Sequence, residues 1–154
     1  MTPHSDNGPE EKSDRGFTLI ELLVVVVILG ILIAIAIPTY LSYRKSAIDK
    51  AAQSDLRGSV GVLELCLATN GSYPATIAAG TTAGASGAAC TGQTISLSST
   101  TTLAYFPVST SDLTAFVIAS TSTGGNGKIY CFSSVKGGSV TTTATAVTGY
   151  RATC

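Results

Sequence analysis

The sequence contains no tryptophan and a single histidine, and charged residues are scarce. Aromatic residues make up 6% and charged residues 12% of the chain, and the formal net charge is zero. A groove lined by stacking aromatic and basic side chains is therefore not indicated, and nucleic acid stays undecided as a partner. After Asn70 there are no paired carboxylates, no phosphate-binding glycine loop and no nucleophile motif. We predict a protein that is not an enzyme, with no cofactor and no bound metal.

One long apolar run near the N-terminus dominates what is present. From Phe17 to Ile37 there are 21 residues, and Glu21 is the only ionisable one. As a helix with a rise of ~1.5 Å per residue, the run reaches ~32 Å and can cross a hydrocarbon core of ~30 Å. A carboxylate at the bilayer centre costs ~2.5–3.5 kcal/mol, and less near the interface. An intramembrane Glu21 therefore calls for a partner.

The segment before this run, residues 1–16, has a different character. It is polar, contains Pro3, Gly8 and Pro9, and shows no apolar periodicity, which is typical of a disordered leader. A secretory signal peptide is cleaved after a shorter apolar region, whereas this run is long and is followed by Pro38. We therefore expect no cleavage after the run.

A charged leader ending in glycine, then Phe, three residues, Glu and a membrane-length run resembles the processing and assembly signal of type IV pilins and the related pseudopilins. The residues that carry the resemblance are Gly16, Phe17, Glu21, the run to Ile37, and Pro38. The resemblance covers about the first 60 residues, and the remainder is similar only in plan. It implies that a membrane peptidase cuts between Gly16 and Phe17 on the cytoplasmic side and methylates the new Phe17 amine. The alternative is an uncut signal anchor.

Glu21 has two interpretations. In the first, its carboxylate snorkels from the first helical turn to the membrane interface, where the helix dipole favours a negative charge. In the second, cleavage exposes an ammonium at Phe17, and Glu21 pairs with that ammonium on a neighbouring subunit. Such a pair forms only between chains with an axial offset, so it would guide the register of an assembly. We favour the second interpretation, which depends on the cleavage.

The charges beside the run disagree with the resemblance about membrane orientation. The leader has Lys12 and Arg15. The other flank has Arg44, Lys45, Lys50 and Arg57. Because cytoplasmic flanks are usually the more basic ones, this count favours the opposite topology. We nevertheless expect a single pass with the leader in the cytoplasm, because the cysteines of the C-terminal part require an oxidising exterior.

Gly30 and Pro38 interrupt the apolar run. Proline lacks a backbone donor and clashes with the carbonyl four residues earlier, so a kink is expected at Pro38. Glycine is a weaker helix former than alanine by about 1 kcal/mol. Residues 30–38 are therefore the segment most able to unwind, and the resemblance implies that this stretch melts on assembly.

From Thr39 to about Thr69 the pattern is typical of an amphipathic helix. The predicted apolar stripe consists of Ile48, Ala52, Leu56, Val60, Leu63 and Leu67. Charged residues are placed on the other faces, and Asn70-Gly71 with Pro74 is a helix stop signal. The predicted organisation is a cleaved leader at 1–16, a transmembrane and assembly helix at 17–38, an amphipathic helix of the head at 39–70, and a loop plus sheet at 71–154.

The sequence of residues 71–154 predicts a loop followed by a small sheet. Residues 72–92 are mostly Ala, Gly, Ser and Thr and are expected to form a surface loop. The expected strands are 93–98, Leu103–Val108, Leu113–Ser120, Lys128–Val135 and a further one within 140–147. Pro107 makes one of them an edge strand, and Gly124-Gly125-Asn126-Gly127 predicts a hairpin. The fold class is α+β: a long N-terminal helix packed on an antiparallel sheet of three or four strands.

Four cysteines lie in the head: Cys66, Cys90, Cys131 and Cys154. Their even number and wide spacing favour disulfides, and the lack of a C-x-x-C motif argues against zinc. Of three possible pairings, we prefer Cys66 with Cys90, which pins the loop to the helix, and Cys131 with Cys154, which ties the C-terminus to a central strand. Each would close a loop of about 25 residues, worth roughly 3 kcal/mol in the chain-entropy model.

The resemblance leads to a hypothesis for the whole chain. It implies a prepilin held in the cytoplasmic (inner) membrane, cleaved after Gly16, N-methylated at Phe17, and polymerised through its N-terminal helix into an extracellular type IV pilus. The expected partners are further copies of the chain, the prepilin peptidase/methyltransferase, the membrane-embedded assembly machinery and, before assembly, the membrane. Such filaments serve adhesion, twitching motility, DNA uptake or secretion. The alternatives are a minor pilin or pseudopilin, and a single-pass surface binding protein that never polymerises.

Overall fold

The computed structural model describes residues 16–78, 84, 87–108, 111, 113–137, 140–143 and 154. The leader before Gly16, part of the predicted loop and residues 144–147 of the strand predicted within 140–147 lie outside these residues. The chain divides into two compact units, which meet in the sequence between Thr39 and Tyr40.

The first unit is helical and has no core of its own among its described residues. It contains the beginning of helix α1, which runs from Leu19 to Asn70 with Pro38 inside it. The large apolar residues from Phe17 to Ile37 are between 49% and 83% exposed. By length and composition alone, α1 is able to cross a membrane. The apolar surface of this unit therefore requires a cover from outside the chain.

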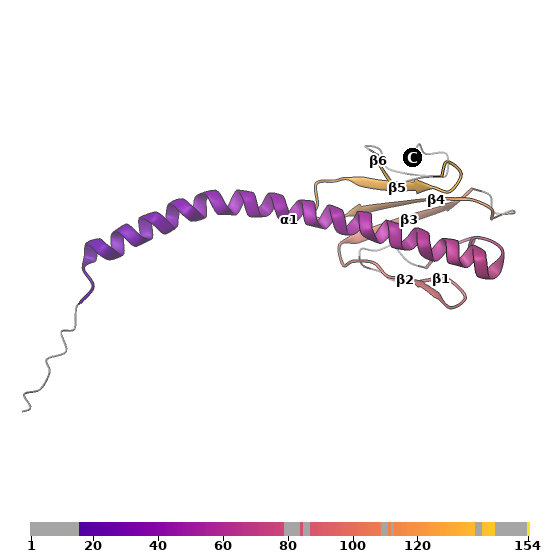
Figure 1. The fold of residues 1–154 in the computed structure, drawn as a ribbon, viewed down its shortest axis with the longest axis horizontal. Coiled ribbons are helices and arrows are strands. Elements are labelled where there is room, and N and C mark those ends of the chain that lie inside the picture. The colour runs from indigo at the N-terminus through magenta and orange to yellow at the C-terminus, as the bar shows by residue number, and fades with distance from the viewer. Residues whose placement is uncertain are drawn as a thin grey trace, which may run out of the picture. The chain divides into compact units, whose positions relative to one another are not determined.

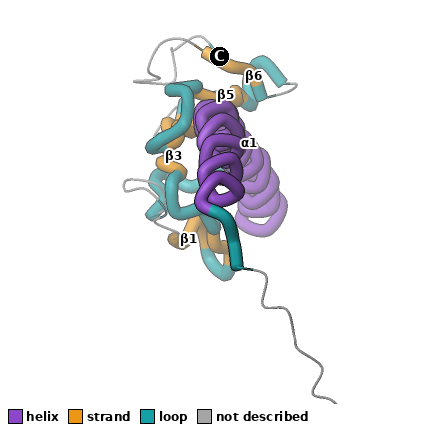
Figure 2. The backbone as a smooth tube through the Cα atoms, turned by 90° about the vertical axis from the view of Figure 1, so that its left-hand side faces the viewer, coloured by secondary structure: helices purple, strands orange, loops and turns teal. Residues whose placement is uncertain are grey.

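The second unit combines the later part of α1 with two antiparallel sheets. Four strands form one sheet in the order β3 (Thr101–Pro107), β4 (Phe116–Ser122), β5 (Ile129–Ser133) and β6 (Thr141–Thr143). The other sheet is a hairpin of β1 (Gly87–Cys90) and β2 (Gln93–Ile95). Figures 1 and 2 show the C-terminal part of α1 lying along the strands of both sheets. This arrangement confirms the predicted α+β class, with a second sheet that was not predicted.

The main core lies between α1 and the sheets. The central strand β4 lies between β3 and β5, and its side chains are buried on both faces of the sheet except at Thr121. Phe116 and Ile118 face α1 and belong to one cluster with Leu56 and Leu63. The ring of Phe116 also contacts three other aromatic rings, those of Tyr73, Tyr105 and Phe132. The opposite face of β4 contributes to a smaller cluster of Val117, Ala119 and Cys131.

Two turn and edge predictions are confirmed. Residues Gly124 to Gly127 lie between β4 and β5, which pair antiparallel. Strand β3 lies at the edge of its sheet and ends at Pro107. Val108 donates its backbone N–H to the Ala115 carbonyl at 2.8 Å. Since hydrogen-bonded positions alternate along an antiparallel pair, Pro107 falls on the outward side, where its missing N–H removes no ladder bond.

The prediction that all of residues 72–92 form a loop is wrong, because Gly87–Cys90 forms β1. Small residues pair here because Ala89 and Ile95 of the hairpin are buried in the main core. The other strands were predicted at the right places, with shifted ends. The predicted strand Leu113–Ser120 corresponds to Phe116–Ser122, and Lys128–Val135 corresponds to Ile129–Ser133.

The predicted stripe of α1 is partly wrong in its register. The fully buried positions of the helix are Asp49, Ala52, Leu56, Ser59, Leu63 and Cys66. These recur at alternating spacings of three and four, while Ile48, Val60 and Leu67 flank them and are half-buried. The predicted stripe was chosen from apolar residues and so did not include Asp49 and Ser59. Polar side chains are expected inside a protein only when they are hydrogen-bonded.

Candidate functional site

The residues around the beginning of α1 form the candidate site. Gly16, Phe17 and Thr18 precede the helix, whose first residue is Leu19. The side chain of Phe17 is 80% exposed, and a Cβ added at Gly16 would meet no other atom within 4 Å. An exposed, non-helical segment of this kind is accessible to a peptidase, which binds its substrate in an extended form.

Thr18 and Glu21 cap the helix reciprocally. The Glu21 N–H donates to Thr18 Oγ1 at 3.3 Å. In return, Glu21 Oε2 accepts from the Thr18 backbone N–H at 3.0 Å and from the Thr18 hydroxyl at 2.8 Å. This is a capping box with Thr18 at the N-cap and Glu21 three residues later. It satisfies two backbone donors that the helix leaves without a partner and holds the carboxylate at the positive end of the helix dipole.

The capping box gives Glu21 a role that the two interpretations of the sequence did not include. Its carboxylate is oriented within the chain, next to the residue that follows Phe17. The contribution of Thr18 was missed. The signal for it was present, because Thr18-Leu19-Ile20-Glu21 matches the pattern of Ser or Thr followed three residues later by Glu or Gln.

An open apolar pocket of about 430 Å³ lies beside this carboxylate. Its lining residues are Phe17, Ile20, Glu21, Val24 and Val25. Glu21 supplies the single charge of this lining. Such a pocket fits a small cation that carries apolar groups. An ammonium with few N–H donors needs few hydrogen-bond acceptors, and the Glu21 carboxylate can supply them together with the opposite charge.

Gly30 and Pro38 lie within α1, and the helix continues through both. A Cβ added at Gly30 would meet no other atom within 4 Å. After the proline, the Thr39 hydroxyl donates to the Ile35 carbonyl at 3.1 Å. Melting of residues 30–38 on assembly stays a prediction.

The cysteines are brought together in two pairs in the second unit. Cys66 of α1 is bonded to Cys90 of β1, with Cα atoms 6.0 Å apart. Cys131 of β5 is bonded to Cys154, with Cα atoms 5.6 Å apart. In the part of the chain that the structure describes, no group of three His, Cys, Asp or Glu residues is placed to hold a metal ion.

Polar contacts join α1 to the rest of the second unit. Asp49 accepts from the Ser122 hydroxyl at 2.9 Å and from the Asn126 side-chain amide at 2.9 Å. Glu64 accepts from the Tyr73 hydroxyl at 3.0 Å. Burial of Tyr73, helped by this bond and by the charge of Glu64, raises the pKa of the hydroxyl to about 12. These carboxylates were predicted on the faces away from the core, which is wrong for Asp49.

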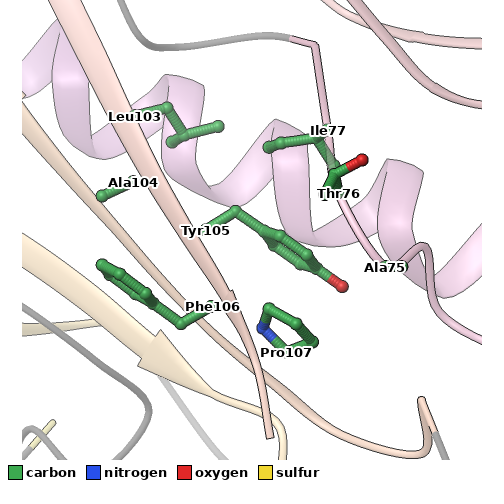
Figure 3. Close-up of a pocket in the computed structure, with 8 residues that line it drawn as sticks. All are labelled: Ala75, Thr76, Ile77, Leu103, Ala104, Tyr105, Phe106 and Pro107. Atoms are coloured by element: carbon green, nitrogen blue, oxygen red, sulfur yellow. The ribbon is translucent and has the colours of Figure 1, made fainter. Parts of the chain in front are cut away.

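A second pocket, of about 420 Å³, lies between β3 and the segment from Ala75 to Ile77. Figure 3 shows the ring of Tyr105 on the same side of β3 as Ile77, whereas the ring of Phe106 lies on the other side of the strand. The Tyr105 hydroxyl donates to the Pro74 carbonyl at 2.6 Å. Its lining carries no ionisable group other than the Tyr105 phenol, so it offers shape and apolar surface but no catalytic acid or base.

Comparison with known proteins agrees with the position of the candidate site. The family model for the prokaryotic N-terminal methylation motif matches residues 12–37. Type II secretion system core protein G of Pseudomonas aeruginosa is 39% identical over 67 residues, which are 44% of this chain and 47% of that protein. The corresponding protein of Klebsiella pneumoniae is 39% identical over 62 residues, or 40% of this chain and 44% of that protein.

A relative of a different kind is the type IV wide pilus major component PilA4 of Thermus thermophilus. It is 41% identical over 68 residues, which are 44% of this chain and 52% of that protein. The chain spans about half the length of the curated relatives that it matches. No solved structure matches it.

Proposed function

Because this chain belongs to the type IV pilin and pseudopilin family, we propose that it is the structural subunit of a type IV pilus filament. Members of this family are structural proteins and not enzymes. In the proposal, the chain is made as a prepilin in the cytoplasmic membrane with its leader in the cytoplasm. It is cleaved after Gly16 and N-methylated at Phe17. It then polymerises through residues 17–38 into an extracellular filament.

The observation that carries this proposal is the oriented carboxylate of Glu21 beside an apolar pocket. Cleavage after Gly16 would give Phe17 a positive amine, and methylation would add an apolar group to it. An N-methylated ammonium therefore matches both the charge and the apolar lining of the pocket. Since the capping box fixes the carboxylate in advance, a neighbouring copy would lose little entropy in binding it.

The exposed apolar surface of the first unit supports polymerisation through the same segment. Each large apolar residue from Leu19 to Ile37 is about half exposed or more. Lipid covers such a surface before assembly, and the same segments of other copies cover it in a filament. In lipid, helices associate by packing and polar pairing because the acyl chains are as apolar as the side chains. A charge pair at Glu21 would then set the axial offset between copies.

The proposal is tested by the N-terminal mass of the protein in mechanically sheared surface fibres. Wild-type fibres are expected to contain a chain that begins at N-methylated Phe17. Glu21→Gln is expected to be processed but missing from the fibres, because glutamine preserves the capping box and lacks the charge. Thr18→Ala is the matched variant, which loses the cap and retains the charge, and it is expected to assemble.

Two results would contradict the proposal at different points. An unprocessed chain confined to the membrane would leave a signal-anchored surface protein instead. Normal assembly of Glu21→Gln would show that the charge pair is not needed for assembly, but the chain would still be a processed pilin.

A pseudopilin or minor pilin is the second candidate. The similarity to type II secretion system core protein G of several bacteria favours it. The amount of the chain in sheared fibres separates the two candidates. A major pilin is expected to be the principal protein of the fibres, whereas a pseudopilin or minor pilin is expected in traces.

A further inference from the structure

The amphipathic half of α1 uses its acidic and basic residues differently. All three of its carboxylates accept hydrogen bonds from the rest of the second unit: Asp49 from Ser122 and Asn126, Asp55 from the Ser98 backbone and hydroxyl, and Glu64 from Tyr73. Its four basic residues are exposed: Arg44, Lys45, Lys50 and Arg57. Within the described parts of the chain, no ion pair engages these four side chains, and Lys50 bonds to the neutral Gln53.

This difference leaves positive charge on the exposed surface of a chain that is neutral overall. The carboxylates that could neutralise the basic residues are instead hydrogen-bonded to neutral groups of the second unit. Arg44 and Lys45 therefore remain available for an anion from outside the chain.

Two exposed tyrosines lie beside these two basic residues. The side chains of Tyr40 and Tyr43 are 66% and 73% exposed. Tyr40, Tyr43 and Arg44 are spaced by three and four positions, so they share one side of the helix. Lys45 follows directly. Tyrosine and basic residues together are enriched where a membrane meets water, because one end of each side chain is apolar and the other is polar.

The position of these residues in the sequence also places them where a membrane meets water. The apolar run that ends at Ile37 is about as long as a hydrocarbon core of ~30 Å is thick. Residues 40–45 follow it within about two helical turns, which places them at the level of the lipid headgroups.

We propose that Tyr40, Tyr43, Arg44 and Lys45 form a docking surface for anionic phospholipid headgroups in the leaflet opposite the leader. The inference rests on the proposed function, because it requires the chain to span a membrane before assembly. Arg44 suits a phosphate through its paired donors and Lys45 adds a second charge. The tyrosine rings lie among the glycerol and upper acyl groups. Departure from the membrane then includes release of these headgroups, which opposes premature loss of the subunit.

The test uses the full chain in vesicles that contain equal amounts of phosphatidylcholine and phosphatidylglycerol. After gentle extraction in detergent, native mass spectrometry counts the lipids of each type that stay bound. The wild type is expected to retain severalfold more phosphatidylglycerol than phosphatidylcholine. Arg44→Gln/Lys45→Gln is expected to abolish this preference. Lys50→Gln/Arg57→Gln removes the same charge farther along the helix and is expected to preserve it.

The outcomes separate this inference from the proposed function. A wild-type chain that an alkaline wash removes from the vesicles would contradict the membrane-spanning precursor itself. A chain that stays inserted without preferring phosphatidylglycerol would overturn only the docking surface. Equal losses in both double variants would also overturn it, because bulk charge would then explain the preference. Unchanged lipid preference with lost binding of double-stranded DNA in the Arg44/Lys45 variant would assign the surface to nucleic acid instead.

Discussion

Asp49 joins the turn between β4 and β5 to helix α1. Its side chain is 2% exposed and accepts hydrogen bonds from the Ser122 hydroxyl, the Asn126 backbone and the Asn126 side chain. Burial alone would raise the pKa of Asp49, but these hydrogen bonds and the charge of Lys128 outweigh it, so the pKa lies below its usual value. Burial raises the pKa of the Tyr130 hydroxyl, and the negative charge of Asp49 raises it further. The ionised carboxylate is therefore part of the folded state.

Asp49→Asn is expected to make stability less sensitive to acid. Because the folded pKa is lowered, the ionised group contributes stability that is complete above its unfolded pKa of about 3.9 and is lost as the pH falls through the folded pKa. The wild type should therefore lose more free energy of unfolding than Asp49→Asn between about pH 5 and pH 2. Denaturant unfolding of the full chain in detergent, followed by near-ultraviolet circular dichroism, measures both curves. Parallel curves would show that Asp49 does not titrate with unfolding.

Gly125 leaves no room for a side chain beside this contact. A Cβ there would overlap Asp49 Oδ1 and the Ser122 hydroxyl. Gly125→Ala is expected to lower the free energy of unfolding by about 1–3 kcal/mol. The control is Gly61→Ala in α1, where the added Cβ meets no atom within 4 Å and the expected change is a gain of about 1 kcal/mol. Changes of the same sign in both variants would contradict the steric argument.

For single residues, the sequence was a better guide to which residues are important than to which atoms they contact. Glu21 was identified from its place in an apolar run, but its bond to Thr18 is a local geometry that was overlooked. Asp49 was placed outside the core because a charged side chain is seldom buried without partners. Its partners, Ser122 and Asn126, lie more than 70 residues away in the sequence, so no local pattern could indicate them.

Elements with strong periodicity or a clear turn signal were predicted well. Helix α1 ends at Asn70, where the Asn-Gly stop signal lies, and the glycine-rich turn joins β4 to β5. Strand β1 was missed because Gly87, Ala88 and Ala89 have low strand propensity. It forms through tertiary contacts, since Cys90 is bonded to α1 and Ala89 packs in the core. Propensity is a weak guide wherever such contacts decide the conformation.

The two disulfides are expected to contribute equally if they act through the unfolded chain. Their sequence separations are 24 and 23 residues. In the chain-entropy model each contributes roughly 3 kcal/mol. Cys66→Ser/Cys90→Ser and Cys131→Ser/Cys154→Ser should therefore lower the free energy of unfolding by similar amounts. A much larger loss for one pair would mean that packing in the folded state dominates there.

The same pairs define an independent check on connectivity. Proteolysis without reductant, followed by mass spectrometry, is expected to yield one peptide pair containing Cys66 and Cys90 and another containing Cys131 and Cys154. A peptide pair that links Cys66 to Cys154 would contradict the pairing in the structure.

For the whole molecule, the two units meet different physical requirements. The buried core clusters consist of residues that follow Tyr40, including Leu56, Phe116 and Ile118. The large apolar residues from Phe17 to Ile37 are exposed and contribute nothing to those clusters. The sequence showed this contrast directly, because an uninterrupted apolar run and an amphipathic pattern require different surroundings.

A chain that begins at Pro38 is therefore expected to fold without the membrane-length run. Proline is well tolerated in the first turn of a helix, where no backbone donor is needed, so the shortened α1 retains a good beginning. The truncated chain should be monomeric in water without detergent and should show the near-ultraviolet circular dichroism and unfolding midpoint of the full chain in detergent. Loss of only residues 1–16 is the control, and that chain should still require detergent or lipid. If the truncated chain lacked a near-ultraviolet circular dichroism signal, residues 17–37 would have to stabilise the head as well as hold it in the membrane. The head would then not fold independently of the segment used for assembly.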